Sequence, residues 1–346
     1  MRKLYNTYDN LSSNLSKFIK FVYSKISKPH LKLIPHIIIG MIQAESVVTN
    51  NIIRKVSSAF FDISFNSITR RFERFFNNSK FDIYSLFDSI IIHIISFYKL
   101  KNKNVYISFD HMFCRDAFTV LLFSLRIGKQ GIPLWFRCFK GKKDPEAFKT
   151  SLIISGIDYI HSLFSNKKCN LIFLADRWFQ NNKIMHHINS INCTFYIRAK
   201  SSTTIRIDNY PDADLINSIN DIPVFYSKSS FFDSVYITKD NFHTKLTISK
   251  SYSHKEPFYI LTNGNTRDAI KHYSKRFGSI EFIFKSQKSN GFHLESSKVR
   301  NITAFSTLYG LMCIAFLWIS ILGSDYSKNQ NHFKQPFKFR TSKSNR

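Results

Sequence analysis

The sequence predicts an α/β protein: a mixed sheet that carries helices, preceded by a helical region and interrupted by a β-rich segment. Three observations predict this fold class. Residues 1–100 hold apolar runs with helical spacing. From residue 104 the chain changes to aromatic and β-branched runs separated by short polar or glycine-containing turns. Amphipathic helical stretches then alternate with further strands, which is typical of helices packed on a sheet.

Composition narrows the class of function. The 346 residues are 44% hydrophobic, enough for a large core, so a disordered chain is excluded. The net charge of +27, from 50 Lys+Arg against 23 Asp+Glu, predicts a polyanionic partner: nucleic acid or an anionic membrane face. The five cysteines are scattered, without the spacing of a zinc ribbon, and no apolar leader follows the first charges. We therefore expect a protein of a reducing compartment, the cytoplasm.

The first 100 residues are predicted to form a helical DNA-binding domain. A helix near 48–57 is followed by a second near 65–77, for which Ser64 or Asn66 could supply the N-cap. The second helix carries basic side chains that could contact DNA, namely Arg70, Arg71 and Arg74. Two short helices with a basic second member suit a helix-turn-helix. A small bundle with a solvated basic face is an equally good interpretation.

Residues 101–200 are predicted to form the first part of the sheet core. The expected strands, of which the first three are consecutive and antiparallel, are 105–113, 117–128, 132–141, 170–179 and 193–200. Helices are expected at 145–164, where Pro145 stands in the first turn, and at 181–191. The run 170–179 lacks alternation, which is typical of a strand buried on both faces.

The remainder of the chain divides into three predicted parts. Residues 201–256 read as a small β-rich insertion, and 257–326 as the second part of the core, with a long amphipathic helix over 266–289. The uncharged run 301–324 is long enough to span a membrane, but its polar residues favour a buried central helix. The tail 327–346 holds six basic and no acidic residues, so we expect it to lie along phosphates.

Three carboxylates are candidates for chemistry. Asp110 and Asp176 each end an apolar strand, where an unpaired carboxylate is costly, and Glu281 lies on the long helix. Three converging carboxylates form a hard oxygen site for Mg²⁺ or Mn²⁺. Two such ions, about 3.5–4 Å apart, would activate a nucleophile and stabilise the leaving oxygen in a phosphoryl displacement.

Around these residues the chain resembles a known family. The resemblance lies in ISFDHMF around Asp110, LADRWF around Asp176 and YSKRFGSIEFIFKSQKSNGFHLE around Glu281. It is to bacterial insertion-sequence transposases of the Asp-Asp-Glu type, specifically the family four type with a β-strand insertion and a Tyr-Arg-Glu-Lys helix. It covers roughly residues 20–325.

The resemblance implies an RNase H-like core with helices on both faces and two divalent ions bound by the three acids. It also implies cleavage of double-stranded DNA at the terminal inverted repeats and joining of the freed 3′-hydroxyl to target DNA. A homodimer in a synaptic complex is expected, and no membrane. The phosphate-contacting residues of the family carry onto Tyr273, Arg276 and Lys288.

One spacing departs from the family pattern, because four residues instead of three separate Arg276 from Glu281. On a regular helix this places them about 140° apart. Gly278 could mark a kink or π-bulge that restores the face. Lys285 shares a face with Glu281 and Lys288, either as a phosphate contact or as a solvated lysine.

Two other functions remain open on the sequence alone: a catalytically inactive, sequence-specific DNA-binding relative, and a basic membrane-associated protein anchored by 301–324. Trp178 could stack an extruded base, but its place beside a buried strand favours the core. Aromatic residues of the insertion are alternatives for stacking: Tyr210, Phe225, Phe231 and Tyr252.

Overall fold

The protein is described here from a computed structural model. The described residues are 2–60, 63–96, 100–142, 144–207, 218–237, 241–252, 256–289 and 291–328. Tyr210 and the greater part of the basic tail lie outside them.

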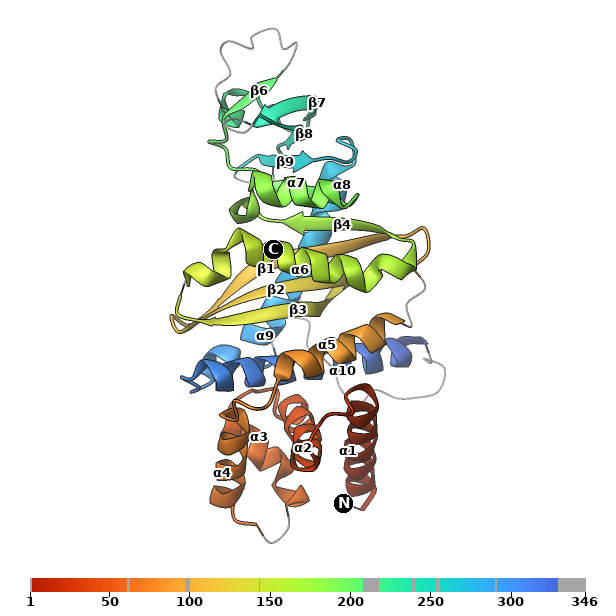
Figure 1. Ribbon diagram of the computed structural model, residues 1–346, viewed down its shortest axis with the longest axis vertical. Helices are drawn as coiled ribbons and strands as arrows, with labels where there is room; N and C mark the ends of the chain where they lie inside the picture. The colour runs from red at the N-terminus through yellow and green to blue at the C-terminus, as the bar shows by residue number, and fades with distance from the viewer. Residues whose placement is uncertain are drawn as a thin grey trace.

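The N-terminal region is helical, as predicted. Its helices are α1 (Arg2–Val22), α2 (Lys28–Ala44), α3 (Thr49–Val56), α4 (Phe65–Phe76) and α5 (Ile83–Ser96), with a 3₁₀ turn at Ser57–Ala59. Ser64 is the N-cap of α4, since its hydroxyl accepts a hydrogen bond from the Ser67 amide at 3.3 Å, and Asn66 lies inside the helix. Figure 1 places α1 to α4 on the side of α5 that faces away from the sheet.

A nine-stranded mixed sheet forms the centre, in the order β3-β2-β1-β4-β5-β9-β8-β7-β6. The strands are β1 (Asn104–Cys114), β2 (Phe118–Ile127), β3 (Gln130–Lys140), β4 (Asn170–Ala175), β5 (Thr194–Arg198), β6 (Ile205–Ile207), β7 (Ser229–Ile237), β8 (Phe242–Ser249) and β9 (Phe258–Thr262). The first three are antiparallel neighbours, as predicted, while β4 and β5 run parallel to β1. The predicted α/β fold class is therefore confirmed.

The strands of the predicted insertion continue this sheet. β9 pairs with β5 on one side and with β8 on the other, in the register Lys245↔Thr262 to Ser249↔Phe258. β7 and β6 follow outward from β8, so the sheet extends in one direction away from the helical end (Figure 1).

Helices cover both faces of the sheet. α6 (Thr150–Phe164) and α7 (Asn182–Ser190) lie on one face, and α8 (Ala269–Tyr273) and α9 (Ile280–Lys288) on the other (Figure 1). A Cβ on Gly156 of α6 would lie 2.7 Å from the Phe123 ring. The next residue of β2, Ser124, points to the opposite face and shares a hydrogen bond of 3.0 Å with Ser279, just before α9.

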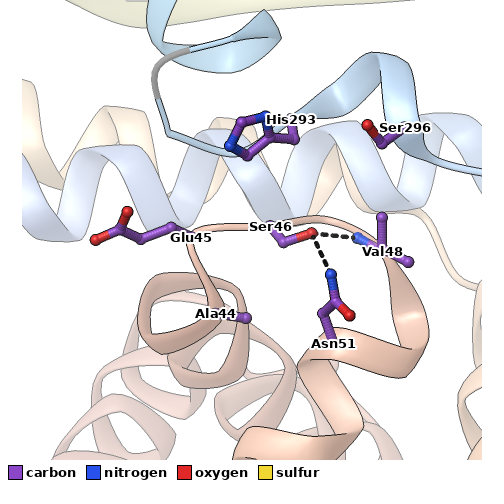
Figure 2. Close-up of a pocket in the computed structure, with 7 residues that line it drawn as sticks. All are labelled: Ala44, Glu45, Ser46, Val48, Asn51, His293 and Ser296. Atoms are coloured by element: carbon purple, nitrogen blue, oxygen red, sulfur yellow. Dashed lines mark hydrogen bonds between the residues drawn. The ribbon is translucent and has the colours of Figure 1, made fainter.

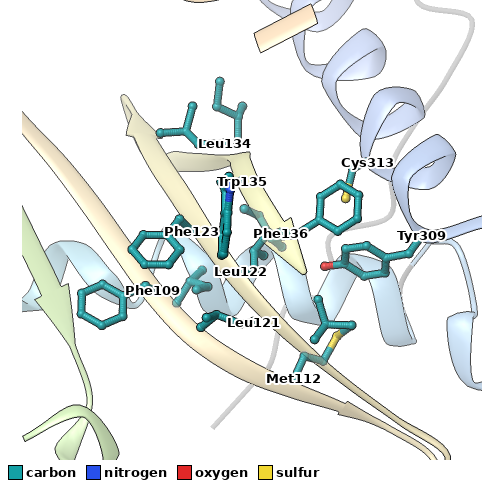
Figure 3. Close-up of a cluster of buried hydrophobic side chains, with 14 of the residues drawn as sticks. Phe109, Met112, Leu121, Leu122, Phe123, Leu134, Trp135, Phe136, Tyr309 and Cys313 are labelled. Carbon is teal, nitrogen blue, oxygen red and sulfur yellow. The ribbon is translucent and has the colours of Figure 1, made fainter. Parts of the chain in front are cut away.

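α10 (Ile302–Lys328) is a buried central helix, as the burial interpretation of 301–324 predicted. It contacts α2, α4, α5 and β3. Figure 3 shows Tyr309 against Phe136, with ring centroids 5.1 Å apart. Gly310 lets α10 approach α5, since a Cβ there would lie 2.2 Å from Cγ1 of Ile83.

By length and composition α10 could also cross a membrane, and so could the bent α2–α3 pair if it counts as one span. Within the protein, however, 78% of the apolar window Ile302–Ser320 is buried. Its apolar surface is therefore already covered by other parts of the chain.

Three predicted elements are shorter than the sequence suggested. The prediction of a single helix over 266–289 was wrong, because the structure has α8, a 3₁₀ turn at Ser274–Arg276 and α9 in its place. A side chain at Gly278 would meet the Lys129 carbonyl oxygen at 2.8 Å, so the chain turns here over the β2–β3 connection. The strand predicted at 170–179 ends at Ala175, and the helix at 145–164 is divided at Lys149 into a 3₁₀ turn and α6.

Candidate active site

The fold brings the three predicted acids into one neighbourhood from three elements. β1 and β4 are parallel and in register up to the pair Phe109↔Ala175. The residue that follows each member of this pair is an acid, so Asp110 and Asp176 lie side by side where β4 ends. Glu281 lies in the first turn of α9, which packs against β1.

Arg276 joins two of these acids. Its Nη2 donates a hydrogen bond to Oδ2 of Asp110, and its Nη1 donates to Oε1 of Glu281 at 2.8 Å. The Arg276 side chain is only 5% exposed, against 21% for Asp110 and 46% for Glu281. The break at Gly278 therefore restores the Arg–Glu contact that a regular helix would separate, and it does so through a turn and not through a π-bulge.

Electrostatics show that the acids affect one another. The pKa of Asp110 is raised from 3.8 to about 6, chiefly by burial. Arg276 and the His111 amide act to lower this pKa, while the charges of Asp176 and Glu281 act to raise it. Burial also raises the pKa of Glu281, and Arg276 again opposes it. The arrangement is a crowded anionic cluster with one buried cation inside it.

The donor set suits a hard divalent ion, because it consists of carboxylate oxygens. In the described part of the chain, however, no group of three Asp, Glu, His or Cys side chains has its ligating atoms placed to hold a metal ion. The guanidinium of Arg276 takes one oxygen of Asp110 and one oxygen of Glu281. The chemistry of the donor atoms fits Mg²⁺ or Mn²⁺, whereas their placement in this structure does not.

The other predicted residues of this segment differ in exposure. Tyr273 is 2% exposed and packs against Phe258 and Phe277, and burial raises its pKa. Lys285 is exposed on α9, whereas Lys288 pairs with Glu295 at 3.2 Å. Phosphate contacts by these residues and by Arg276 stay predictions.

The basic residues of the N-terminal region form a separate surface. Arg70, Arg71 and Arg74 are exposed on α4, while Ile68 and Phe72 of the same helix are buried. Figure 1 places α4 on the far side of α5 and α10 from the sheet, so this surface is distinct from the acids. Helix-turn-helix and plain bundle remain alternative interpretations.

Sequence reasoning missed two features beside Asp176. Trp178 is 67% exposed, so the prediction that it belongs to the core was wrong: the strand ends before it, and Asp176 caps a 3₁₀ turn. Arg177 and Arg198 both reach Oε2 of Glu256, at 3.2 and 3.3 Å. The only sequence signal for this ion-pair group was Arg177, the basic residue directly after Asp176.

A cavity of about 360 Å³ lies elsewhere, between the α2–α3 turn and the segment after α9 (Figure 2). Ser46 organises the turn, since its hydroxyl accepts hydrogen bonds from the Val48 amide at 3.1 Å and from Asn51 at 3.3 Å. His293 faces it from the other segment (Figure 2). None of the three acids lines this cavity, so it is not the candidate active site.

No family model matches the sequence, and no curated protein matches it. Among solved structures, the chain is similar to Argonaute of Marinitoga piezophila in complex with 5′-OH guide RNA and target DNA, with 16% identity over 50% of this chain and 25% of that chain and a TM-score of 0.24. A structure of the same Argonaute with guide RNA has 14% identity over 51% and 25% of the two chains, also at a TM-score of 0.24. The matched part is a quarter of the length of those chains.

Proposed function

We propose that the protein is a DNA transposase of the Asp-Asp-Glu type with an RNase H-like core. It would cleave double-stranded DNA at the terminal repeats of its element and join the freed 3′-hydroxyl to target DNA. Its partners would be these DNA ends and a second copy of the chain in a synaptic complex, in the cytoplasm at the nucleoid.

The observation that carries the proposal is the meeting of Asp110, Asp176 and Glu281, which lie far apart in the sequence. Parallel register, not chance, sets the first two side by side. The order β3-β2-β1-β4-β5, with three antiparallel strands followed by two parallel ones, supports the RNase H-like core of this proposal. The net charge of +27 supports a polyanionic substrate.

In this proposal Asp110, Asp176 and Glu281 would hold Mg²⁺ or Mn²⁺, and the bound ion would supply charge stabilisation for attack on a phosphodiester. The sheet fixes Asp110 and Asp176, and α9 sets Glu281 opposite them. In strand cleavage a water oxygen forms the new bond to phosphorus as the bond to the 3′-oxygen breaks. In joining, that 3′-hydroxyl attacks a target phosphodiester and displaces its 3′-oxygen.

The test is Glu281→Gln, with Asp116→Asn as a matched control because Asp116 is 80% exposed and pairs with Lys142 outside the cluster. Each protein is mixed with labelled linear duplexes taken from DNA flanking the gene that encodes it, with and without Mg²⁺. We expect Glu281→Gln to lose cleavage by more than about 100-fold while binding DNA as before. Cleavage by Glu281→Gln at the wild-type rate would refute the assignment.

A second function is favoured by one observation, the guanidinium of Arg276 between Asp110 and Glu281. A permanent ion pair there would keep metal out and leave a sequence-specific DNA-binding protein without catalysis. In that case the wild-type protein would bind the same duplexes but would not cleave them at any Mg²⁺ or Mn²⁺ concentration.

A further inference from the structure

We propose that Arg276 is an internal substitute for the metal ion: it occupies the place between Asp110 and Glu281 until a divalent cation displaces it. This inference rests on the proposed function, because it describes how access to the same site is regulated. It makes Arg276 a positioning and gating residue, whose departure is a condition for metal binding.

Both carboxylate oxygens of Asp110 accept hydrogen bonds within the protein. Its Oδ1 accepts the His111 amide at 2.8 Å, and its Oδ2 accepts Nη2 of Arg276. Both oxygens are thus engaged, and Glu281 accepts a hydrogen bond from the other terminal nitrogen of the same guanidinium at 2.8 Å. A Mg²⁺ ion shared by these two carboxylates would need oxygens at about 2.0–2.1 Å, which places it within the volume of the guanidinium. The two cations therefore exclude each other.

Arg276 is buried with one donor unpaired within the described part of the chain, and it lies on a turn. The side chain is 5% exposed, and its Nε is buried without a hydrogen-bond partner among the described residues. A buried donor left unpaired weakens the closed arrangement. The residue also lies at the end of a 3₁₀ turn, and residues 277–279 connect it to α9 as a turn. This turn is held by hydrogen bonds to the third residue back, from the Phe277 amide to the Ser274 carbonyl at 3.3 Å and from the Ser279 amide to the Arg276 carbonyl at 3.0 Å, and not by a continuous α-helical ladder. The segment can thus adjust without breaking a continuous helix.

A neighbouring arginine supplies a matched control. Arg126 donates from Nη1 to the Lys275 carbonyl oxygen at 2.6 Å and from Nε to the Gly128 carbonyl oxygen at 2.9 Å. It holds the same turn and has the same charge, but it has no hydrogen bond or ion pair with the acids. A change at Arg126 tests the general loss of a cation near the turn.

The experiment measures Mn²⁺ binding to the full chain without DNA, from the electron paramagnetic resonance signal of free Mn²⁺. Removal of the competing cation should tighten Mn²⁺ binding about tenfold in Arg276→Gln, while Arg126→Gln binds as wild type and Arg276→Lys lies between them. Asp110→Asn should lose the site.

Two results would overturn the inference in distinguishable ways. If Asp110→Asn loses Mn²⁺ but Arg276→Gln binds no more tightly than wild type, the metal site stands and the exchange is refuted. If Asp110→Asn binds Mn²⁺ as wild type does, no metal site exists there, and the proposed function fails together with the inference.

A second measurement uses only the wild-type chain, in case Arg276→Gln does not fold. Phenylglyoxal labels accessible guanidinium groups, and mass spectrometry assigns the labelled residues. We expect labelling of Arg276 to rise severalfold when Mn²⁺ is added, with that of Arg126 unchanged. Equal labelling of Arg276 with and without saturating Mn²⁺ would refute the displacement.

Discussion

Folding stability without metal should depend on pH through Asp110. The fold raises the pKa of this carboxyl from 3.8 to about 6, so the folded chain holds a proton that the unfolded chain has already released. Stability from this group is fully present below pH 3.8 and is lost as the pH rises through about 6. This pKa shift changes the free energy of unfolding by at most about 3 kcal/mol. Because Asp110 and Glu281 interact, their titrations are coupled, and we expect about 1–2 kcal/mol of this change to be assignable to Asp110.

The assay is urea unfolding in the presence of EDTA, at several values between about pH 4 and pH 7.5. The free energy of unfolding of the wild-type chain should fall across this range by about 1–2 kcal/mol more than that of Asp110→Asn. The difference between the two slopes is the quantity of interest, because it is independent of any constant change that the amide causes at Arg276. Asp116→Asn is the control, since its carboxylate lies outside the cluster.

Parallel changes in wild type and Asp110→Asn would refute the reasoning, because they would show that Asp110 is not buried among the other acids. A slope of opposite sign, with the wild-type chain gaining stability as the pH rises, would mean that Arg276 outweighs burial. In that case the ion pair, not desolvation, would control this carboxyl.

Further predictions concern the core and the basic helix. Gly310→Ala should destabilise the protein by about 1–2 kcal/mol in urea unfolding, because overpacking against Ile83 outweighs the gain in helix propensity; adding Ile83→Ala should cost less in that background than alone, and simple additivity would contradict the close approach. Replacing Arg70, Arg71 and Arg74 with glutamine should make binding to duplex DNA less dependent on salt. The negative slope of log binding constant against log salt concentration should decrease in magnitude by about 2–3. An unchanged slope would remove α4 from the DNA interface.

Local patterns predicted the regular elements well. The aromatic and β-branched runs fixed β1 to β3, and the apolar spacing fixed α4 with its Ser64 cap. The uncharged run at 301–324 was assigned to a buried helix because a membrane span would not need its polar residues. In each case the signal lies within a few residues of the element itself.

Two predictions were wrong because their causes are not visible in the local sequence pattern. A helical pattern runs through Gly278 without interruption, and only the Lys129 carbonyl oxygen packed against it shows why the helix stops. The exposure of Trp178 depends on β4 ending at Ala175, which the apolar run conceals. Lys129 lies far along the chain from Gly278, so sequence alone does not assign that contact, and the end of β4 is hidden within a continuous apolar run.

The candidate site was only partly within reach of the sequence. Strand ends and a family resemblance selected Asp110, Asp176 and Glu281, and the fold gathers them. The contact of Arg276 with two of them at once required coordinates, since a continuous helix would have kept it apart from Glu281.

The position of α10 has a consequence for the order of synthesis. It is the last helix described, yet it packs against α2, α4, α5 and β3, so both the helical region and the edge of the sheet depend on it. Rings such as Phe118, which stacks on Phe305 at 4.0 Å, stay uncovered on the ribosome until this helix emerges. A polypeptide stopped before residue 302 would therefore be an aggregation-prone fragment and not a smaller working protein.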